Sequence, residues 1–104
     1  MKILALEKEV PGISDDQFTA PLLKTEAMRA WKLHQTGIIR ELYFRQDRNE
    51  AVLILECKDT EEARSVLATL PLMKSGLIGF EIIPLIPYDG FARLFSEEVH
   101  SKPS

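Results

Sequence analysis

Residues 38–57, IIRELYFRQDRNEAVLILEC, determine the fold that the sequence predicts. Residues 38–45 and 51–57 are rich in β-branched and aromatic side chains, as strands are. The polar residues 46–49 between them are typical of a hairpin loop. The stretch therefore predicts two neighbouring antiparallel strands in the middle of the chain.

A four-residue loop fixes the register of this hairpin, because it pairs Arg45 with Glu50. The resulting cross-strand pairs are Tyr43 with Val52, Glu41 with Ile54, and Ile39 with Glu56. Side chains alternate between the two faces of a strand, so the register assigns every residue of the hairpin to one face.

Further elements lie on both sides of the hairpin. Residues 2–9 predict a strand, and residues 21–35 carry apolar side chains at helical spacing up to a stop at Gly37. A second helix starts after Asp59 and ends at Pro71, and residues 77–86 form a last strand. The order β-α-β-β-α-β predicts a ferredoxin-like α+β fold, with a four-stranded antiparallel sheet and two helices on one face.

The start of the first helix has two interpretations. Ser14 and Gln17 have the spacing of a capping box. Pro21 is tolerated in a first turn but is costly deeper in a helix. Either Thr19 is the true N-cap, or a short initial turn leads into the main helix.

Extension of the hairpin register to the other strands predicts the two sheet faces. The helix-covered core then contains Leu4, Leu6, Leu42, Phe44, Leu53, Leu55, Ile78, Phe80 and Ile82. The opposite face carries Ile39, Glu41, Tyr43, Arg45, Val52, Ile54, Glu56, Ala5, Glu7, Glu81 and Ile83. Because this mixed face is too apolar for free solvent, we expect a second copy of the chain to cover it, forming a dimeric α+β barrel around a partly polar cavity.

Composition excludes several classes of protein. Thirteen basic against 16 acidic residues give a formal charge of −3, which lacks the positive field of a nucleic-acid binder. No apolar run is long enough to span a membrane or to form a signal peptide. The single Cys57 fits a reducing compartment and is expected to be a small buried hydrophobe. We therefore expect a cytoplasmic protein that binds neither nucleic acid nor membranes.

Three short motifs carry a family resemblance: Arg40, Leu42 and Tyr43 after Gly37, then Leu70-Pro71-Leu72, and Glu81 in the last strand. Over about residues 22–88 the chain resembles the small dimeric α+β barrel proteins of the muconolactone isomerase type. The resemblance implies a homodimer around a ligand cavity. It also implies an isomerase or a cofactor-free oxygenase, with no cofactor.

His34 and Glu41 are the candidate catalytic residues. An imidazole titrates near neutral pH, and a buried carboxyl beside others gains proton affinity, so both can carry protons. The neighbouring carboxylates Glu7, Glu56 and Glu81 could share that face. The alternatives are that His34 complements the helix dipole and that the carboxylates are rim residues paired with arginines.

The candidate ligand-binding residues surround this pair. Trp31 and Tyr43 could form the walls, Arg40 or Arg45 could hold a carboxylate, and Glu56 and Glu81 could add polar contacts. Packing of the aromatic rings and solvation of the arginines are the alternatives. No set of side chains has zinc spacing, so we expect no metal.

The leading hypothesis is a cofactor-independent, isomerase-like enzyme that moves protons on a small cyclic or carboxylated metabolite. The alternative is a non-catalytic ligand-binding or dimerisation module. A cavity filled by side chains would favour the second hypothesis, whereas an open cavity is compatible with an enzyme or a binder.

The C-terminal part carries a short apolar stripe at Phe91, Leu94 and Phe95. Because large apolar side chains gain by burial, we expect residues 88–95 to pack across the dimer or to cover the cavity. The alternative is that they patch the edge of their own core. We assign residues 1–95 to one domain and 96–104 to a flexible tail.

Overall fold

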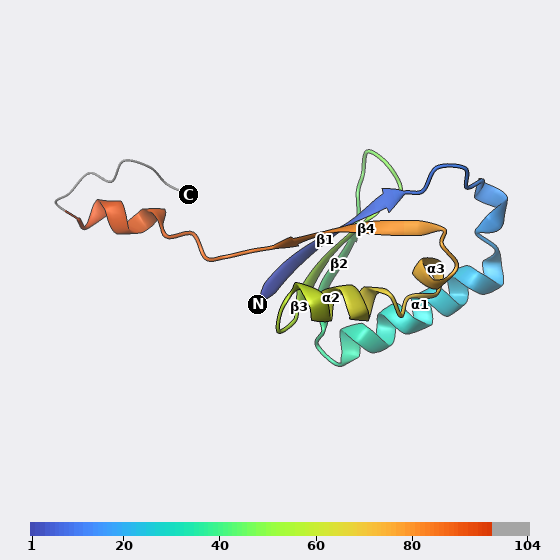
Figure 1. The fold of residues 1–104 in the computed structure, drawn as a ribbon, viewed down its shortest axis with the longest axis horizontal. Helices are drawn as coiled ribbons and strands as arrows, with labels where there is room; N and C mark the ends of the chain where they lie inside the picture. Colours follow the sequence, from blue (N-terminus) through green and yellow to red (C-terminus); the bar gives the residue numbers. More distant parts are fainter. Residues whose placement is uncertain (97–104) are drawn as a thin grey trace.

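Four antiparallel strands form one sheet in the order β2-β3-β1-β4, and two helices cover the same face of it (Figure 1). The computed structural model describes residues 1–96. The elements are β1 (Lys2–Glu9), η1 (Asp15–Gln17), α1 (Ala20–Gln35), β2 (Ile39–Phe44), β3 (Ala51–Glu56), α2 (Thr60–Leu67), α3 (Pro71–Lys74), β4 (Ile78–Pro84) and η2 (Gly90–Leu94). The predicted ferredoxin-like α+β fold is confirmed. Within residues 1–96, no helix is long and apolar enough to cross a membrane.

The start of the first helix combines the two interpretations: Thr19 caps the helix, and a separate short turn precedes it. Thr19 is the N-cap of α1, and its side-chain oxygen accepts a hydrogen bond from the Leu22 N–H at 3.4 Å. A separate short turn, η1, precedes it, and there the Ser14 N–H donates to Gln17 Oε1 at 2.9 Å. At the other end, Gly37 has a φ of 83°, which suits glycine, and stops the helix as expected.

The second helical region is longer than the sequence pattern indicated. The carboxylate of Asp59 accepts the Glu62 N–H at 2.8 Å, so the predicted N-cap of α2 is confirmed. Pro71 follows the end of this helix, but it also begins the short helix α3, which the pattern did not predict. Proline is favoured at this position, because the N–H of a first-turn residue has no partner within the helix and its absence costs nothing.

The hairpin register agrees with the prediction at two pairs and differs at the third. Tyr43 lies opposite Val52, and Glu41 lies opposite Ile54. A β-bulge between Ile39 and Glu41 then shifts the register, and Ile39 pairs with Leu55. One extra residue turns the following side chains to the other face. The placement of Ile39 on the uncovered face was therefore wrong: it lies in the core, fully buried.

The side chains of strand β1 point to the faces opposite to those predicted. Ile3 and Ala5 are fully buried and pair with Leu55 and Leu53 of β3. The core positions assigned to Leu4 and Leu6 were wrong, and both lie on the uncovered face. Residues 3–6 are all apolar, so the strand has no alternation from which the phase could be read. Glu7 points to the same face as Ala5, so it lies on the helix-covered face of the sheet and not on the uncovered face.

The buried core joins the inner face of the sheet to α2, α3 and one residue of α1. Its members are Ile3, Ala5, Leu33, Ile39, Leu53, Leu55, Cys57, Ala63, Leu67 and Leu70, with a smaller cluster of Leu72, Leu77 and Ile78. Cys57 is a buried hydrophobe as expected, and burial raises the pKa of its thiol.

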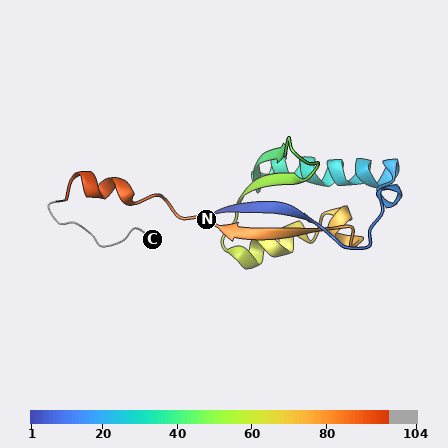
Figure 2. The ribbon, with the colours of Figure 1, turned by 90° about the horizontal axis from the view of Figure 1, so that it is seen from above.

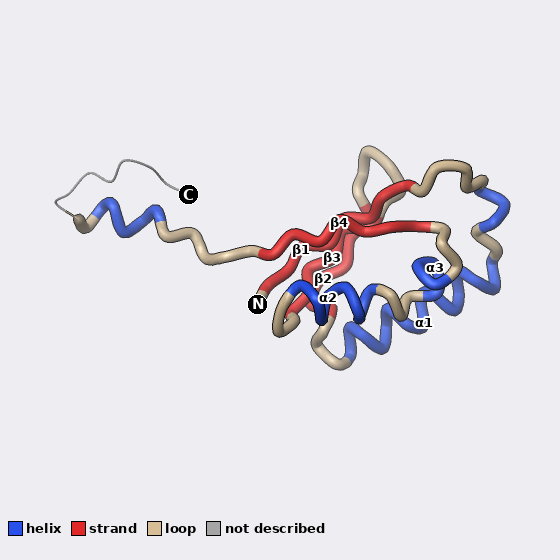
Figure 3. Tube along the Cα trace, viewed as in Figure 1, coloured by secondary structure: helices blue, strands red, loops and turns tan. Residues whose placement is uncertain are grey.

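Beyond β4 the chain leaves the body as an extended arm, which we define as residues 86–95. Figures 1, 2 and 3 show it projecting away from the sheet and helices, with η2 at its outer part. The overall extents of 60 × 29 × 24 Å reflect this projection. Its large apolar side chains are exposed: Ile86, Tyr88, Phe91, Leu94 and Phe95. The arm therefore does not patch its own core, and the tail predicted at 96–104 lies, apart from Ser96, outside the described residues.

Candidate functional site

The apolar stripe of α1 faces a cavity rather than a packed core. Its members Leu23, Ala27, Ala30, Trp31 and His34 all line a cavity of about 1190 Å³ between α1 and the sheet. Strand residues such as Ile39, Leu53 and Phe80 line it from the sheet side. Leu33 is the one buried residue of α1. The helix thus stands off the sheet and leaves room for a small molecule.

Glu7 brings a carboxyl group to the sheet wall of this cavity. Its Oε1 accepts the Ala51 N–H at 2.9 Å, which holds the side chain between β1 and β3. Burial raises the pKa of Glu7; the hydrogen bond from Ala51 opposes this, and the negative charge of Glu50 adds to it. A proton is therefore held more tightly here than on a surface glutamate.

Glu26 brings a second carboxyl group, from α1. Its Oε1 accepts the Leu72 N–H at 2.9 Å, so it joins α1 to the first turn of α3. Burial raises the pKa of Glu26; the bond from Leu72 opposes this, and the negative charge of Glu7 raises it further. Glu26 therefore lies within range of the negative charge of Glu7.

This pair has the properties of an acid/base couple. Each carboxyl is half-buried, and one oxygen of each is occupied by a backbone N–H, which leaves the other for a ligand. Burial raises the pKa of both carboxyls, and the negative charge of Glu7 raises that of Glu26 further, so each group holds a proton more tightly than a surface glutamate does. Carboxyl groups of this kind can serve as proton donors or acceptors for a bound ligand.

His34 and Trp31 line the cavity between α1 and the sheet, whereas the sequence analysis placed the cavity on the opposite, uncovered face. His34 Nδ1 donates to the Ile39 carbonyl at 2.9 Å, so Nε2 remains as an acceptor in the neutral ring. The Trp31 ring lies beside it, with 6.2 Å between ring centroids. Trp31 is 56% exposed and can cover a ligand at the rim of the cavity.

Glu41 does not share the cavity with His34. Tyr43 borders the cavity on the edge strand β2, but its hydroxyl donates to Glu41 Oε1 at 2.6 Å, and both side chains are exposed. Glu41 pairs with Ile54 on the face that the helices leave uncovered. Within the single chain, Tyr43 and His34 therefore line the cavity and Glu41 does not.

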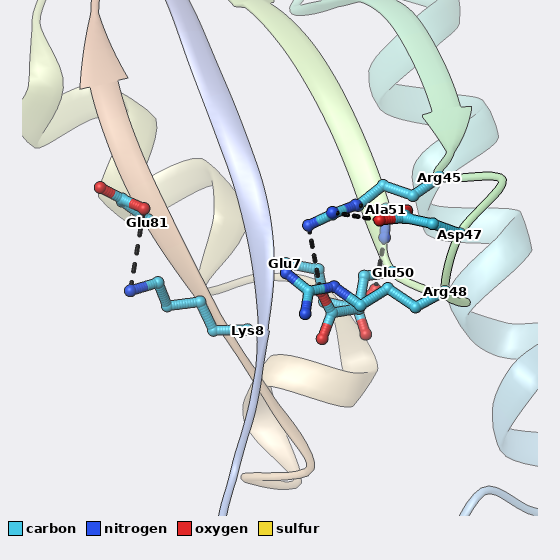
Figure 4. A network of polar contacts seen from close by, with 8 residues as sticks. All are labelled: Glu7, Lys8, Arg45, Asp47, Arg48, Glu50, Ala51 and Glu81. Atoms are coloured by element: carbon cyan, nitrogen blue, oxygen red, sulfur yellow. Dashed lines mark hydrogen bonds and ion pairs between the residues drawn. The ribbon is translucent and has the colours of Figure 1, made fainter.

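Arg40 and Arg45, the two candidates for binding a ligand carboxylate, form hydrogen bonds with other groups of the protein. Arg40 Nε donates to the Gly37 carbonyl at 2.5 Å at the end of α1. Arg45 donates to both carboxylate oxygens of Asp47, at 2.9 and 2.6 Å, in the hairpin loop (Figure 4). Neither arginine lines the cavity.

The two remaining predicted carboxylates also lie outside the cavity. Glu56 accepts a hydrogen bond from the Met1 amino group at 2.6 Å, which lowers the pKa of this carboxyl. Glu81 lies 3.7 Å from Lys8 Nζ in an exposed ion pair (Figure 4). Exposed pairs of this kind contribute little to stability.

Sequence reasoning missed Glu26 and placed Glu7 on the wrong face. A signal for Glu26 was present: it lies three residues after Leu23 and four before Ala30, on the apolar stripe of the helix. A charged residue on the apolar face of a helix is costly to bury without polar partners, so its presence there indicates a polar contact or a cavity. Within residues 1–96, no group of three or more His, Cys, Asp or Glu side chains is placed to hold a metal ion.

The raised pKa of Glu26 predicts how the stability depends on pH. Between the ordinary value of 4.5 and the higher native value, the folded protein holds the proton more tightly than the unfolded chain does. Its free energy of unfolding therefore falls as the pH rises through this window, and then levels off. Urea denaturation should show this fall in the wild type relative to Glu26→Gln, by less than about 1 kcal/mol because the group is half-exposed. A matched Glu61→Gln variant, on the exposed face of α2, should follow the wild type.

Together, the ferredoxin-like sheet, the cavity under α1 and the carboxyl pair define an α+β protein with a small-molecule site. A family model identifies it more closely: that of muconolactone delta-isomerase matches residues 3–90. The chain therefore belongs to the muconolactone delta-isomerase family. A comparison with curated proteins finds no match.

Two solved structures show the same fold. A crystal structure of muconolactone isomerase has 18% sequence identity and a TM-score of 0.71, with 100% of both chains covered. A 5-chloro-2-hydroxyhydroquinone dehydrochlorinase from Burkholderia phenoliruptrix AC1100, in complex with 2,5-dihydroxybenzoquinone, has 18% identity and a TM-score of 0.59. In that match, 83% of this chain and 94% of the other are covered.

Proposed function

We propose that this protein is a cofactor-independent isomerase that shifts a double bond in a small cyclic molecule by proton transfer. The observation that carries the proposal is the pair of half-buried carboxyls, Glu7 and Glu26, on the sheet wall and helix wall of one apolar cavity. The family membership supports an isomerase. The dehydrochlorinase structure holds a small cyclic ligand, 2,5-dihydroxybenzoquinone, which is the class of molecule proposed here.

The proposed reaction uses the two carboxyls in turn. The ionised carboxylate removes a proton from a carbon next to the ring carbonyl, and the electron pair moves into a dienolate. The protonated partner then delivers its proton to the far carbon of that system, so the double bond moves and no atoms are gained or lost. Each carboxyl ends in the state in which the other began, and exchange with water restores the pair.

Other cavity residues hold the ring during this transfer. Trp31 would cover one face of the ligand, as flat aromatic groups do. His34 Nε2 would accept a hydrogen bond from a ligand hydroxyl or take up a proton, because Nδ1 is fixed on the Ile39 carbonyl. These roles keep the predicted site residues Trp31 and His34 and replace Glu41 by the pair of Glu7 and Glu26.

The proposal includes a homodimer. The uncovered sheet face carries a half-buried apolar patch, formed by Leu4, Leu6, Val52, Ile54 and Ile83. With Leu4 and Leu6 on this face, it is more apolar than the sequence analysis expected and better suited to packing against a second copy. A cytoplasmic location is also part of the proposal and rests on the single buried thiol of Cys57.

Solvent deuterium gives a direct test. Unsaturated five-membered lactones incubated with the protein in deuterium oxide should gain deuterium at the carbon that receives the proton, followed by NMR, as the double bond moves. Boiled protein is the control. Ligand binding without exchange or isomerisation would contradict the proposed catalysis and favour a non-catalytic binding module.

A further inference from the structure

Arg48 is the one lysine or arginine among the described residues that line the cavity. It lies in the hairpin loop between β2 and β3, and its side chain is 61% exposed. The guanidinium is therefore accessible to a ligand at the edge of the cavity. Arg48 also borders a second, smaller hollow of about 280 Å³, together with Lys8 and Arg45. The apolar cavity thus meets a charged surface at this residue.

The ion pair that holds Arg48 leaves part of its guanidinium unused. Its Nε lies 2.9 Å from Glu50 Oε1, and the Glu50 side chain is only 17% exposed (Figure 4). Within residues 1–96, Glu50 is the one carboxylate that pairs with Arg48. Because a guanidinium presents parallel N–H donors to a carboxylate, the two terminal nitrogens can bind a second carboxylate while Nε stays on Glu50.

Glu50 has a second cation close to it. Arg45 Nη1 lies 3.8 Å from Glu50 Oε1, while the main partner of Arg45 is Asp47, at 2.6 Å. The charge of Glu50 therefore stays compensated when Arg48 shares its own charge with a ligand. The network can accept one further carboxylate at Arg48 without leaving Glu50 unpaired.

The position of Arg48 relative to the carboxyl pair suits a ligand with two binding points. Glu50 precedes Ala51, whose N–H donates to Glu7 at 2.9 Å, and the charge of Glu50 acts on Glu7. Figure 4 shows Glu7, Glu50 and Arg48 in the same part of the molecule. A carboxylate on Arg48 would lie at the Glu7 end of the cavity, and a ring joined to it by a short link would reach the apolar walls.

We infer that Arg48 is a specificity-determining residue of the cavity: its terminal nitrogens bind the carboxylate of a ring's side chain, while its Nε stays on Glu50. This inference rests on the proposed function for the location of the site and adds to it a residue that positions the ring. Without Arg48, a ligand carboxylate would meet the negative charges of Glu7 and Glu50.

Two saturated, unreactive probes test this inference on the full-length protein. One is a five-membered lactone with a carboxymethyl group, and the other is its methyl ester. We expect calorimetry to show that the acid binds at least about 10-fold more tightly than the ester, the size of one charge-assisted contact. Added salt should reduce this preference, because it screens the attraction.

Substitutions of Arg48 connect the preference to this side chain. Arg48→Gln should remove most of the preference for the acid. Arg48→Lys, which keeps the charge but lacks the parallel donors, should retain part of it. Arg64→Gln is the matched control, since Arg64 is similarly exposed, at 60%, and pairs with Glu61 but does not line the cavity. This control should bind both probes like the wild type.

Glu50→Gln provides a change in the opposite direction. It releases Arg48 from its partner, so the acid should bind several-fold more tightly. The gain should be much smaller when Arg48→Gln is already present, because the two side chains then no longer compete for one charge. A purely structural role of Arg48 predicts no such coupling.

Kinetics with the unsaturated, reactive acid separate binding from chemistry. Arg48→Gln should raise KM at least about 10-fold and leave kcat within about threefold, since the contact is equally present in the ground state and the transition state.

The outcomes separate the inference from the proposed function. A preference for the acid that depends on Arg48, with no turnover of the unsaturated acid, would support the inference and contradict the proposed catalysis. Equal binding of the two probes, tighter binding of the ester, no binding of the acid at millimolar concentration, or an equal loss of preference in Arg48→Gln and Arg64→Gln would overturn the inference, whatever the turnover.

Discussion

Replacement of Glu26 by glutamine is expected to lower isomerase turnover by about 10²- to 10⁴-fold, the usual contribution of a positioned proton carrier. Glutamine keeps the size of the side chain and an oxygen that can accept the Leu72 N–H, so the contact between α1 and α3 should persist. What is lost is the exchangeable proton. Turnover of a lactone substrate, measured beside circular dichroism of the same preparation, checks this result.

Glu7→Gln should produce a loss of similar size. Because the two carboxyls act as a unit, the double variant should be little worse than either single variant. Glu61→Gln, exposed on α2, is the matched control and should retain full activity. Full turnover by Glu26→Gln would show that Glu26 is not a proton carrier. It would also contradict the proposed proton transfer by the pair of Glu7 and Glu26.

Local sequence rules predicted most of the fold. The hairpin pairs of Tyr43 with Val52 and of Glu41 with Ile54 follow from the loop length. Asp59 caps its helix and Gly37 ends the other, because these positions need a side-chain acceptor and a positive φ. Such rules depend on near neighbours in the chain, so one sequence is sufficient to apply them.

The site was harder to predict because it depends on how far apart the layers stand. The stripe from Leu23 to His34 has the pattern of a helix face packed on a core, and nothing in its spacing distinguishes a core from a cavity. The phase of β1 was hidden by four successive apolar residues. The phase of β1 decides whether Glu7 lies in the cavity or on the uncovered face. Because the sequence left this phase ambiguous, the prediction placed Glu7 on the wrong face.

Truncation after Pro87 is the second change with a large expected effect. The removed part of the arm includes Phe91, Leu94 and Phe95, which are at least 66% exposed in the single chain. Burial of such side chains contributes roughly 1.5–3 kcal/mol each. If a second copy covers them in the dimer, their removal should weaken dimerisation by at least about 100-fold. Sedimentation velocity over a range of concentrations measures this change.

Several controls distinguish docking on a second copy from a purely structural role. The buried core contains no residue of the arm, so the truncated chain should remain folded, with an unchanged circular dichroism spectrum. A chain ending at Ser96 should stay as dimeric as the full chain. Phe91→Ser with Phe95→Ser, in the full-length protein, should weaken the dimer in the same direction as truncation. A truncated protein that dimerises and turns over substrate like the full chain would show that the arm does not dock on the partner, and the dimer would then depend on the uncovered sheet face alone.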